Sequence, residues 1–217
     1  MLGRIIDVFD RRLKFKEDFK KNVLDHPVPQ RINLTYCFGG ISFLLYMLLA
    51  ATGIAMIFFY VPSVDHAFVT VEYITFDLPL GNILRGIHHW SANIMIVVLF
   101  LHMLRVYVYG AYKNPREFNW ITGVVLFAFV LAFGFTGYLL PWDQKAYWAT
   151  KVGVLMPQSA PVAGPFISKL LMGGDQLGAL TISRFYAVHV AVLPIITVVF
   201  LVGHFLMIRR TGIAEPL

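Results

Sequence analysis

The sequence predicts an all-α membrane protein, a bundle of four transmembrane helices preceded by an amphipathic interfacial helix. Of the 217 residues, 58% are hydrophobic and only 14% are charged, a much lower charged fraction than soluble domains carry. The mean hydropathy is +0.70. Four apolar stretches are each long enough to cross the hydrocarbon layer, which takes about 20 helical residues.

Residues 1–31 are predicted to form an amphipathic helix at the cytoplasmic membrane surface, ahead of a core at 32–217. Apolar side chains such as Ile5, Phe9 and Leu13 are interleaved with basic residues, and the HPVP run at 26–29 ends the helix. The alternative is a plain solvated leader segment.

The four predicted spans cover approximately residues 33–60, 86–109, 118–140 and 183–208. They are expected to be helical because lipid offers no partner for unpaired backbone amides. Short charged connections separate them, except for the long segment 141–182. That segment is too apolar for disorder, and we expect two short helices in it, near 143–154 and 163–172.

The distribution of Lys and Arg predicts that both termini lie on the cytoplasmic side, or its topological equivalent. Thirteen of these residues fall in the N-terminal segment, at the turn between the second and third spans, and after the fourth span, and five fall on the opposite side. Topology therefore explains the net charge of +6 better than nucleic-acid binding does. The second and fourth spans then run in the same direction, from outside to inside.

Those two parallel spans carry histidines at matching depths. His88 and His102 are fourteen residues apart, and His189 and His204 are fifteen apart. At about 100° per residue, both intervals return to within roughly 60° of the starting direction, so each pair shares one helix face. His88 and His189 are expected to meet near the outer end, and His102 and His204 near the inner end.

This pairing predicts two haem sites. A lone intramembrane histidine is more often a packing or hydrogen-bonding residue, but packing does not explain four that are paired by depth and face. Zinc would need three or four converging ligands, and no carboxylate or thiol completes either pair. A porphyrin iron needs only two axial imidazoles. The ~1.5 Å rise per residue puts the two irons roughly 21 Å apart along the bundle.

Glycines repeat the same interval in the other two spans. Gly39 and Gly53 lie in the first, and Gly123 and Gly137 lie in the third, again fourteen residues apart. Because glycine weakens a helix, the repeat favours clearance for a flat macrocycle. Close helix packing through small residues is the alternative.

The stretches RGIHHWSA, LHMLRVY, GAYKNPREFNW, GFTGYLLPWDQ, SRFYAVH and HFLMIRRTGI resemble the cytochrome b6 family, including its Gram-positive menaquinol-oxidising relatives. The resemblance extends from NLTYCFGG to the C-terminus. It implies the electron-transfer core subunit of a proton-translocating quinol:cytochrome c or plastocyanin-type oxidoreductase, which is catalytic only within its complex. Electrons would pass from quinol oxidation on the outer side, through two b haems, to an inner quinone site in a Q cycle.

The resemblance also implies roles for individual residues. His88 and His189 would ligate the outer haem b, and His102 and His204 the inner one. Cys37 would bind a third haem through one thioether, although a lone thiol at a helix end is usually inert. The haem propionates would be neutralised by basic residues, namely Arg85, Arg184 and Arg209, for which interfacial anchoring is the alternative.

Part of the outer quinol-oxidation site is matched by Tyr138, Pro141, Trp142 and Asp143, the last three opening the segment 141–182. In this family a companion three-helix subunit with a Pro-Glu-Trp-Tyr motif completes that site. The other implied partners are a Rieske iron–sulfur protein, a c-type cytochrome, membrane lipids and a second copy of the complex.

Three stretches, HHW at 88–90, GAYKNPRE and ATKVG, resemble the Gram-positive relatives more than the photosynthetic form. This resemblance implies menaquinone in preference to plastoquinone and a bacterial cell membrane in preference to a thylakoid. His89 would point about 100° away from the face of His102 and is not expected to be a ligand. His26 and His66 are expected at the surface.

Two other functions remain open at this stage. A different dihaem anchor, such as the membrane subunit of a dehydrogenase or hydrogenase, would lack both a PWDQ-type loop and a covalent haem. A non-haem transporter would be colourless, and it would usually carry a carboxylate or a broken helix near the midplane.

Overall fold

The computed structural model describes residues 33–214, and every regular element in that part of the chain is helical. A 3₁₀ turn, Leu34–Cys37, leads into α3 (Phe38–Ile57), and α5 (Gly81–Val108) and α6 (Glu117–Leu139) follow. The helix α9 (Ala179–Ala187) continues through a π turn, Val188–Val192, into α10 (Leu193–Thr211). The predicted interfacial helix at 1–31 lies outside the described residues.

Four helices are long and apolar enough to cross a membrane: Leu34–Ile57, Gly81–Val108, Glu117–Leu139 and Ala179–Thr211. They confirm the four predicted spans. Their outward faces expose large apolar side chains such as Trp90, Phe118 and Ile195, which suits a lipid environment and not water.

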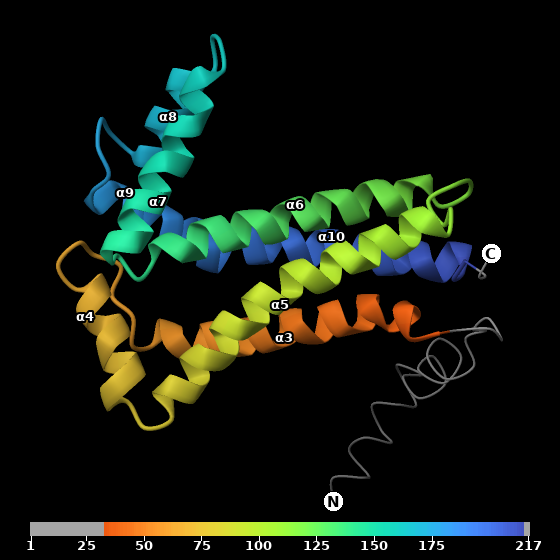
Figure 1. The fold of residues 1–217 in the computed structure, drawn as a ribbon, viewed down its shortest axis with the longest axis horizontal. Coiled ribbons are helices and arrows are strands. Elements are labelled where there is room, and N and C mark those ends of the chain that lie inside the picture. Colours follow the sequence, from red (N-terminus) through yellow and green to blue (C-terminus); the bar gives the residue numbers. More distant parts are fainter. Residues whose placement is uncertain (1–32, 215–217) are drawn as a thin grey trace, which may run out of the picture.

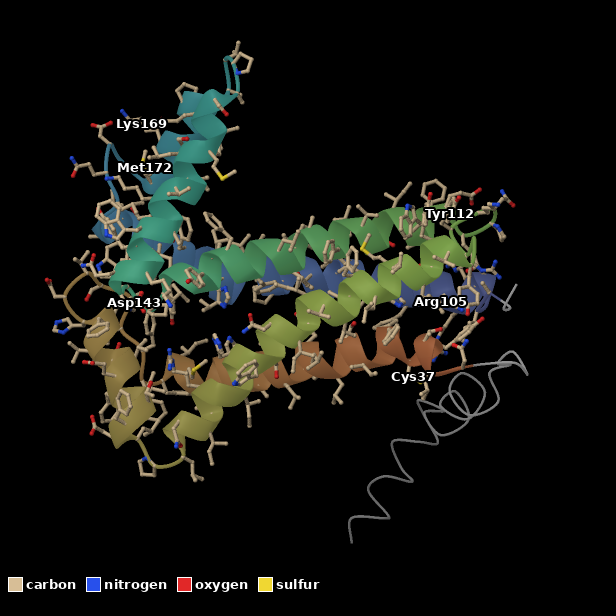
Figure 2. All side chains as sticks on the ribbon, in the orientation of Figure 1. Cys37, Arg105, Tyr112, Asp143, Lys169 and Met172 are labelled. Atoms are coloured by element: carbon tan, nitrogen blue, oxygen red, sulfur yellow. The ribbon has the colours of Figure 1, made fainter. Side chains whose placement is uncertain are left out.

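The four long helices form two antiparallel pairs, with α3 along α5 and α6 along α10 (Figure 1). Between α5 and α10 there is little direct contact. Cys37 and Arg105 lie together at one end of the bundle, and Asp143 lies at the other (Figure 2). We call these the Cys37 end and the Asp143 end. The helices α5 and α10 both run toward the Cys37 end, as the predicted topology requires.

At the Asp143 end, the long segment folds into α7 (Gln144–Leu155), a 3₁₀ turn (Met156–Ser159) and α8 (Gly164–Met172). These helices match the two predicted near 143–154 and 163–172. Their buried contacts are made by Leu139, Val154, Met172 and Phe185, so this arm, which projects from the bundle in Figure 1, is fixed to α6 and α9 by one apolar cluster.

The first connection differs from the prediction of a short charged link. Residues 58–80 contain α4 (Ala67–Glu72) and a π turn (Tyr73–Asp77), and α5 begins at Gly81 and not near residue 86. A side chain at position 81 would overlap the Ile74 carbonyl oxygen, which lies where a Cβ would be. The tight entry into α5 therefore depends on glycine, and hydropathy alone does not report it.

Candidate haem sites and neighbouring residues

Each of the four predicted ligand histidines faces one of the four regularly spaced glycines. A Cβ added to Gly53 would lie 3.3 Å from Cε1 of His88, and one added to Gly39 would lie 3.1 Å from Cε1 of His102. These contacts join α3 to α5. The sequence interpretation assigned the glycines to macrocycle clearance, and the structure gives them a more direct neighbour, the imidazole ring itself.

The second helix pair repeats the arrangement. A Cβ at Gly137 would lie 2.7 Å from Cε1 of His189, and one at Gly123 would lie 3.5 Å from Cε1 of His204. All four rings thus lie against helix backbone at a position without a side chain. This contact holds each imidazole close to the neighbouring helix and restricts its orientation.

The histidines are also paired across the bundle as the sequence predicts. His88 and His189 are electrostatic neighbours toward the Asp143 end, and His102 and His204 are neighbours toward the Cys37 end. Within residues 33–214, no group of three or more His, Cys, Asp and Glu side chains converges to hold a metal ion unaided. Two facing imidazoles therefore fit a group that brings its own equatorial ligands, as a porphyrin does.

His189 lies inside the π turn Val188–Val192. The N–H of Leu193 bonds the carbonyl of Val188, five residues back, and Pro194, which has no N–H to donate, follows directly. A proline in a helix clashes with the preceding turn, and a widened turn relieves that clash. Such π turns often occur at functional positions, and this one contains a predicted haem ligand.

Three of the four rings have a threonine as hydrogen-bonding partner. The distances from ring Nδ1 to threonine Oγ1 are 2.9 Å for His88 and Thr52, 3.1 Å for His204 and Thr122, and 3.0 Å for His189 and Thr136. Nδ1 of His102 is buried with no partner. The sequence analysis missed these threonines, although each directly precedes one of the glycines in the chain.

Arg105, which the sequence analysis used only for topology, has an unusual setting at the Cys37 end. Its guanidinium lies over the ring of Tyr36, 3.7 Å from the ring centroid, and 5.0 Å from that of Tyr109. Its Nε and Nη2 atoms are buried and have no hydrogen-bond acceptor. A buried guanidinium with free donors is matched to a carboxylate.

The predicted basic residues have less specific surroundings. Arg184 donates from Nη1 to the Leu170 carbonyl at 2.8 Å, so it links α9 to α8. Arg209 is exposed in the last turn of α10, and Arg85 is half-buried in α5. Of these three arginines, Arg184 is the one whose guanidinium already donates a hydrogen bond that joins two helices.

Cys37 is exposed at the start of α3. Its sequence neighbours contact the two groups of interest, because Tyr36 stacks on Arg105 and Gly39 faces His102. The thiol therefore lies at the same end of the bundle as Arg105 (Figure 2), two residues before the glycine that faces His102.

The residues predicted for the quinol site lie at the corner between α6 and α7. Trp142 has a positive φ of 53°, a backbone conformation that is costly for a bulky residue and tends to occur at functional sites. The carboxylate of Asp143 accepts the N–H of Ala146 at 2.7 Å, so it caps α7. Tyr138 is exposed and Pro141 is half-buried.

The remaining histidines fit their predicted settings where the structure describes them. His89 is exposed, and its Nε2 lies 3.3 Å from Nδ2 of Asn93, one turn further along α5. His66 is exposed ahead of α4. His26 lies outside the described residues.

Comparison with known proteins gives consistent matches over the chain. The family described as cytochrome b/b6/petB matches residues 23–212. Cytochrome b6 of Tupiella akineta and of Gracilaria tenuistipitata var. liui are each 46% identical over 216 residues, covering 100% of both chains. Cytochrome b6 of Euglena gracilis is 44% identical over the same length.

A solved structure of a hyperthermophilic respiratory Complex III is 29% identical, with a TM-score of 0.88. The match covers 97% of this chain and 56% of that one, so the chain spans about half the length of that relative.

Proposed function

The chain belongs to the cytochrome b/b6 family, and from that premise we propose that it is the electron-carrying subunit of a membrane quinol oxidoreductase. Quinol is oxidised at the Asp143 end, and electrons cross by way of two haem b sites to a quinone site at the Cys37 end. Proton release on one side and uptake on the other complete a Q cycle and build a gradient.

The observation that carries this proposal is the set of four histidine–glycine contacts. His88 and His189 would hold one haem b, and His102 and His204 the other, because each pair supplies two imidazoles and no further ligand. When bound, each haem iron supplies reversible one-electron transfer. The chain's own part is to fix the imidazoles against helix backbone and to keep water from the sites.

The polar groups at the Cys37 end support carboxylate binding there. Arg105 has two buried donors without an acceptor, and a haem propionate would satisfy both in a forked pair. We therefore add Arg105 to Arg85 and Arg209 as a propionate partner. Arg184 is the weakest of the original three, since a backbone carbonyl already takes its hydrogen bond.

A third haem, attached covalently at Cys37, is supported by the exposure of that thiol and by its position at the same end of the bundle as Arg105. The quinone-reduction site would lie at the same end. Menaquinone is favoured over plastoquinone by the HHW, GAYKNPRE and ATKVG stretches, and these also favour a bacterial cell membrane.

The quinol-oxidation site is proposed at the α6–α7 corner, where the backbone strain at Trp142 and the half-buried Pro141 shape the surface. Tyr138 would face the quinol, and Asp143 would hold α7 in place. A companion subunit with a Pro-Glu-Trp-Tyr motif would complete the site. A Rieske protein and a c-type cytochrome would take the other electron, in a homodimeric complex with the Cys37 end on the cytoplasmic side.

The proposal is tested by a reduced-minus-oxidised spectrum of the purified complex, followed by acid–acetone extraction and a haem-stained denaturing gel. We expect a b-type α band, and haem retained on the 24.6 kDa chain after extraction. In Cys37→Ala the retained haem disappears and the b band stays. A colourless protein from a haem-replete host contradicts the whole proposal, and loss of all haem on extraction contradicts only the covalent haem.

A further inference from the structure

Three of the four histidines share one local arrangement. In each, a threonine directly precedes the glycine that faces the ring, and its Oγ1 lies within hydrogen-bonding distance of the ring Nδ1. The dipeptide Thr-Gly occurs at 52–53, 122–123 and 136–137. The fourth glycine, Gly39, is preceded by Phe38, and its histidine is the one with no partner at Nδ1.

The direction of these hydrogen bonds follows from the threonine hydroxyls. A hydroxyl has one hydrogen to donate and can also accept. Each of these hydroxyls lies within bonding distance of a carbonyl in its own helix: Thr52 is 2.6 Å from the Leu48 oxygen, Thr122 is 3.0 Å from that of Asn119, and Thr136 is 2.7 Å from that of Ala132. A carbonyl can only accept, so the hydroxyl hydrogen is used there.

The hydroxyl oxygen is therefore left to accept from the imidazole. Nδ1 then carries the ring proton, and the lone pair lies on Nε2, the nitrogen that points away from the threonine. This is the tautomer that a metal-ligating imidazole needs. The threonines thus prepare His88, His189 and His204 as Nε2 ligands.

His102 lacks this preparation. Its ring lies 3.1 Å from a Cβ added at Gly39, within the range of the other three contacts, but Phe38 offers no hydroxyl, and Nδ1 is buried without a partner. A hydrogen bond from Nδ1–H strengthens an imidazole as a donor to iron. His102 is therefore the weakest donor of the four.

We infer that Thr52, Thr122 and Thr136 are positioning residues that fix the tautomer and strengthen the donor character of three haem ligands, and that the site at the Cys37 end is left with one strengthened ligand. This inference rests on the proposed haem function. A stronger donor stabilises ferric iron and lowers the reduction potential. The difference favours electron transfer from the Asp143 end, with two strengthened ligands, toward the Cys37 end.

The test is a redox titration of the intact complex, followed at the b-type α band and resolved into two components. Thr122→Val removes the hydroxyl at almost constant shape, and we expect it to raise the potential of the Cys37-end haem alone. Thr122→Ser keeps the hydroxyl and should leave both potentials unchanged. Thr136→Val should raise the potential of the other haem alone.

The converse substitution adds a hydroxyl opposite His102, the one histidine that has no threonine partner. Phe38→Thr creates a Thr-Gly pair opposite His102 and should lower the potential of the Cys37-end haem. Phe38→Val removes the aromatic ring without adding a hydroxyl, so it controls for the change in packing. The two components are assigned from the single-ligand variants His189→Leu and His204→Leu, each of which should lack one of them.

The outcomes distinguish a failure of this inference from a failure of the proposed haem function on which it rests. If both haems are present and the valine variants leave the potentials unchanged, the threonines do not tune the ligands and the inference is wrong. It is equally wrong if one valine variant moves both components together, or if Thr122→Ser behaves like Thr122→Val. Absence of b haem from the unmodified complex would instead contradict the proposed function.

Discussion

Gly137 and His189 pack so closely that a Cβ on residue 137 would lie 2.7 Å from the imidazole Cε1. A contact of that length is shorter than atoms tolerate, so alanine at 137 requires the ring or the helix to move. The opposing atoms belong to the ring of His189, whose backbone lies in the π turn between α9 and α10. The position of the His189 ring therefore requires glycine at residue 137.

Gly137→Ala is expected to displace His189 and to weaken haem retention at the Asp143 end by about tenfold or more, the usual scale for disturbing a ligand's support. The measurement is haem b per chain in the purified complex. Gly40→Ala is the matched control, because an added Cβ there meets nothing within 4 Å. If Gly137→Ala keeps both haems at their original potentials, the proposed ligation by His189 is contradicted.

His88 and His89 are adjacent in α5, and only His88 is a proposed haem ligand, so variants of the two can be compared directly. His88 faces Gly53 and Thr52 in the bundle, whereas His89 is exposed and its ring lies within hydrogen-bonding distance of Asn93 in the same helix. His88→Leu should remove about half of the b-type absorbance, since a haem with one axial imidazole is poorly held. His89→Leu should retain both haems, and equal losses in the two variants would contradict the assignment.

The positions of the helices could be predicted from local features of the sequence, such as apolar runs, proline, glycine and N-cap residues. The arm helices end where proline and glycine interrupt them, and Asp143 is a typical N-cap residue, so α7 and α8 fell within one residue of the predicted bounds. The start of α5 was missed by several residues. Its boundary depends on the contact between Gly81 and the Ile74 carbonyl, which hydropathy does not report.

Of the candidate site, only the part that depends on residue spacing along the chain could be predicted from the sequence. Intervals of fourteen and fifteen residues were enough to pair the four histidines by depth. The threonine partners depend on the register between α3 and α5 and between α6 and α10, residues up to 82 positions apart in sequence. Arg105 looked like a topology signal because the stacking of its guanidinium on Tyr36 appears only once the helices are packed.

Arg105→Leu is expected to lower the potential of the Cys37-end haem, because removing a nearby positive charge stabilises the ferric form. A redox titration resolved into two components measures the shift. Arg105→Lys keeps the charge but loses the fork, so an intermediate value is expected. Arg210→Leu, at an exposed position at the same end, is the control. An equal shift in Arg210→Leu would mean that Arg105 acts only as a distant charge.

Variants of Asp143 distinguish a structural role of this residue from a chemical role at the proposed quinol site. Its side chain accepts the Ala146 N–H at 2.7 Å, and replacing an N-cap with alanine costs about 1 kcal/mol. Asp143→Ala should therefore speed hydrogen exchange of the α7 amides and slow quinol oxidation.

Asp143→Asn keeps a capping oxygen without the carboxylate charge, so both its amide exchange and its quinol oxidation rate should stay near those of the unmodified complex. If the asparagine variant protects α7 but oxidises quinol as slowly as the alanine variant, the carboxylate itself takes part in the quinol chemistry. In that case capping is a secondary role of this residue, because the fold of the arm would be intact while the reaction fails.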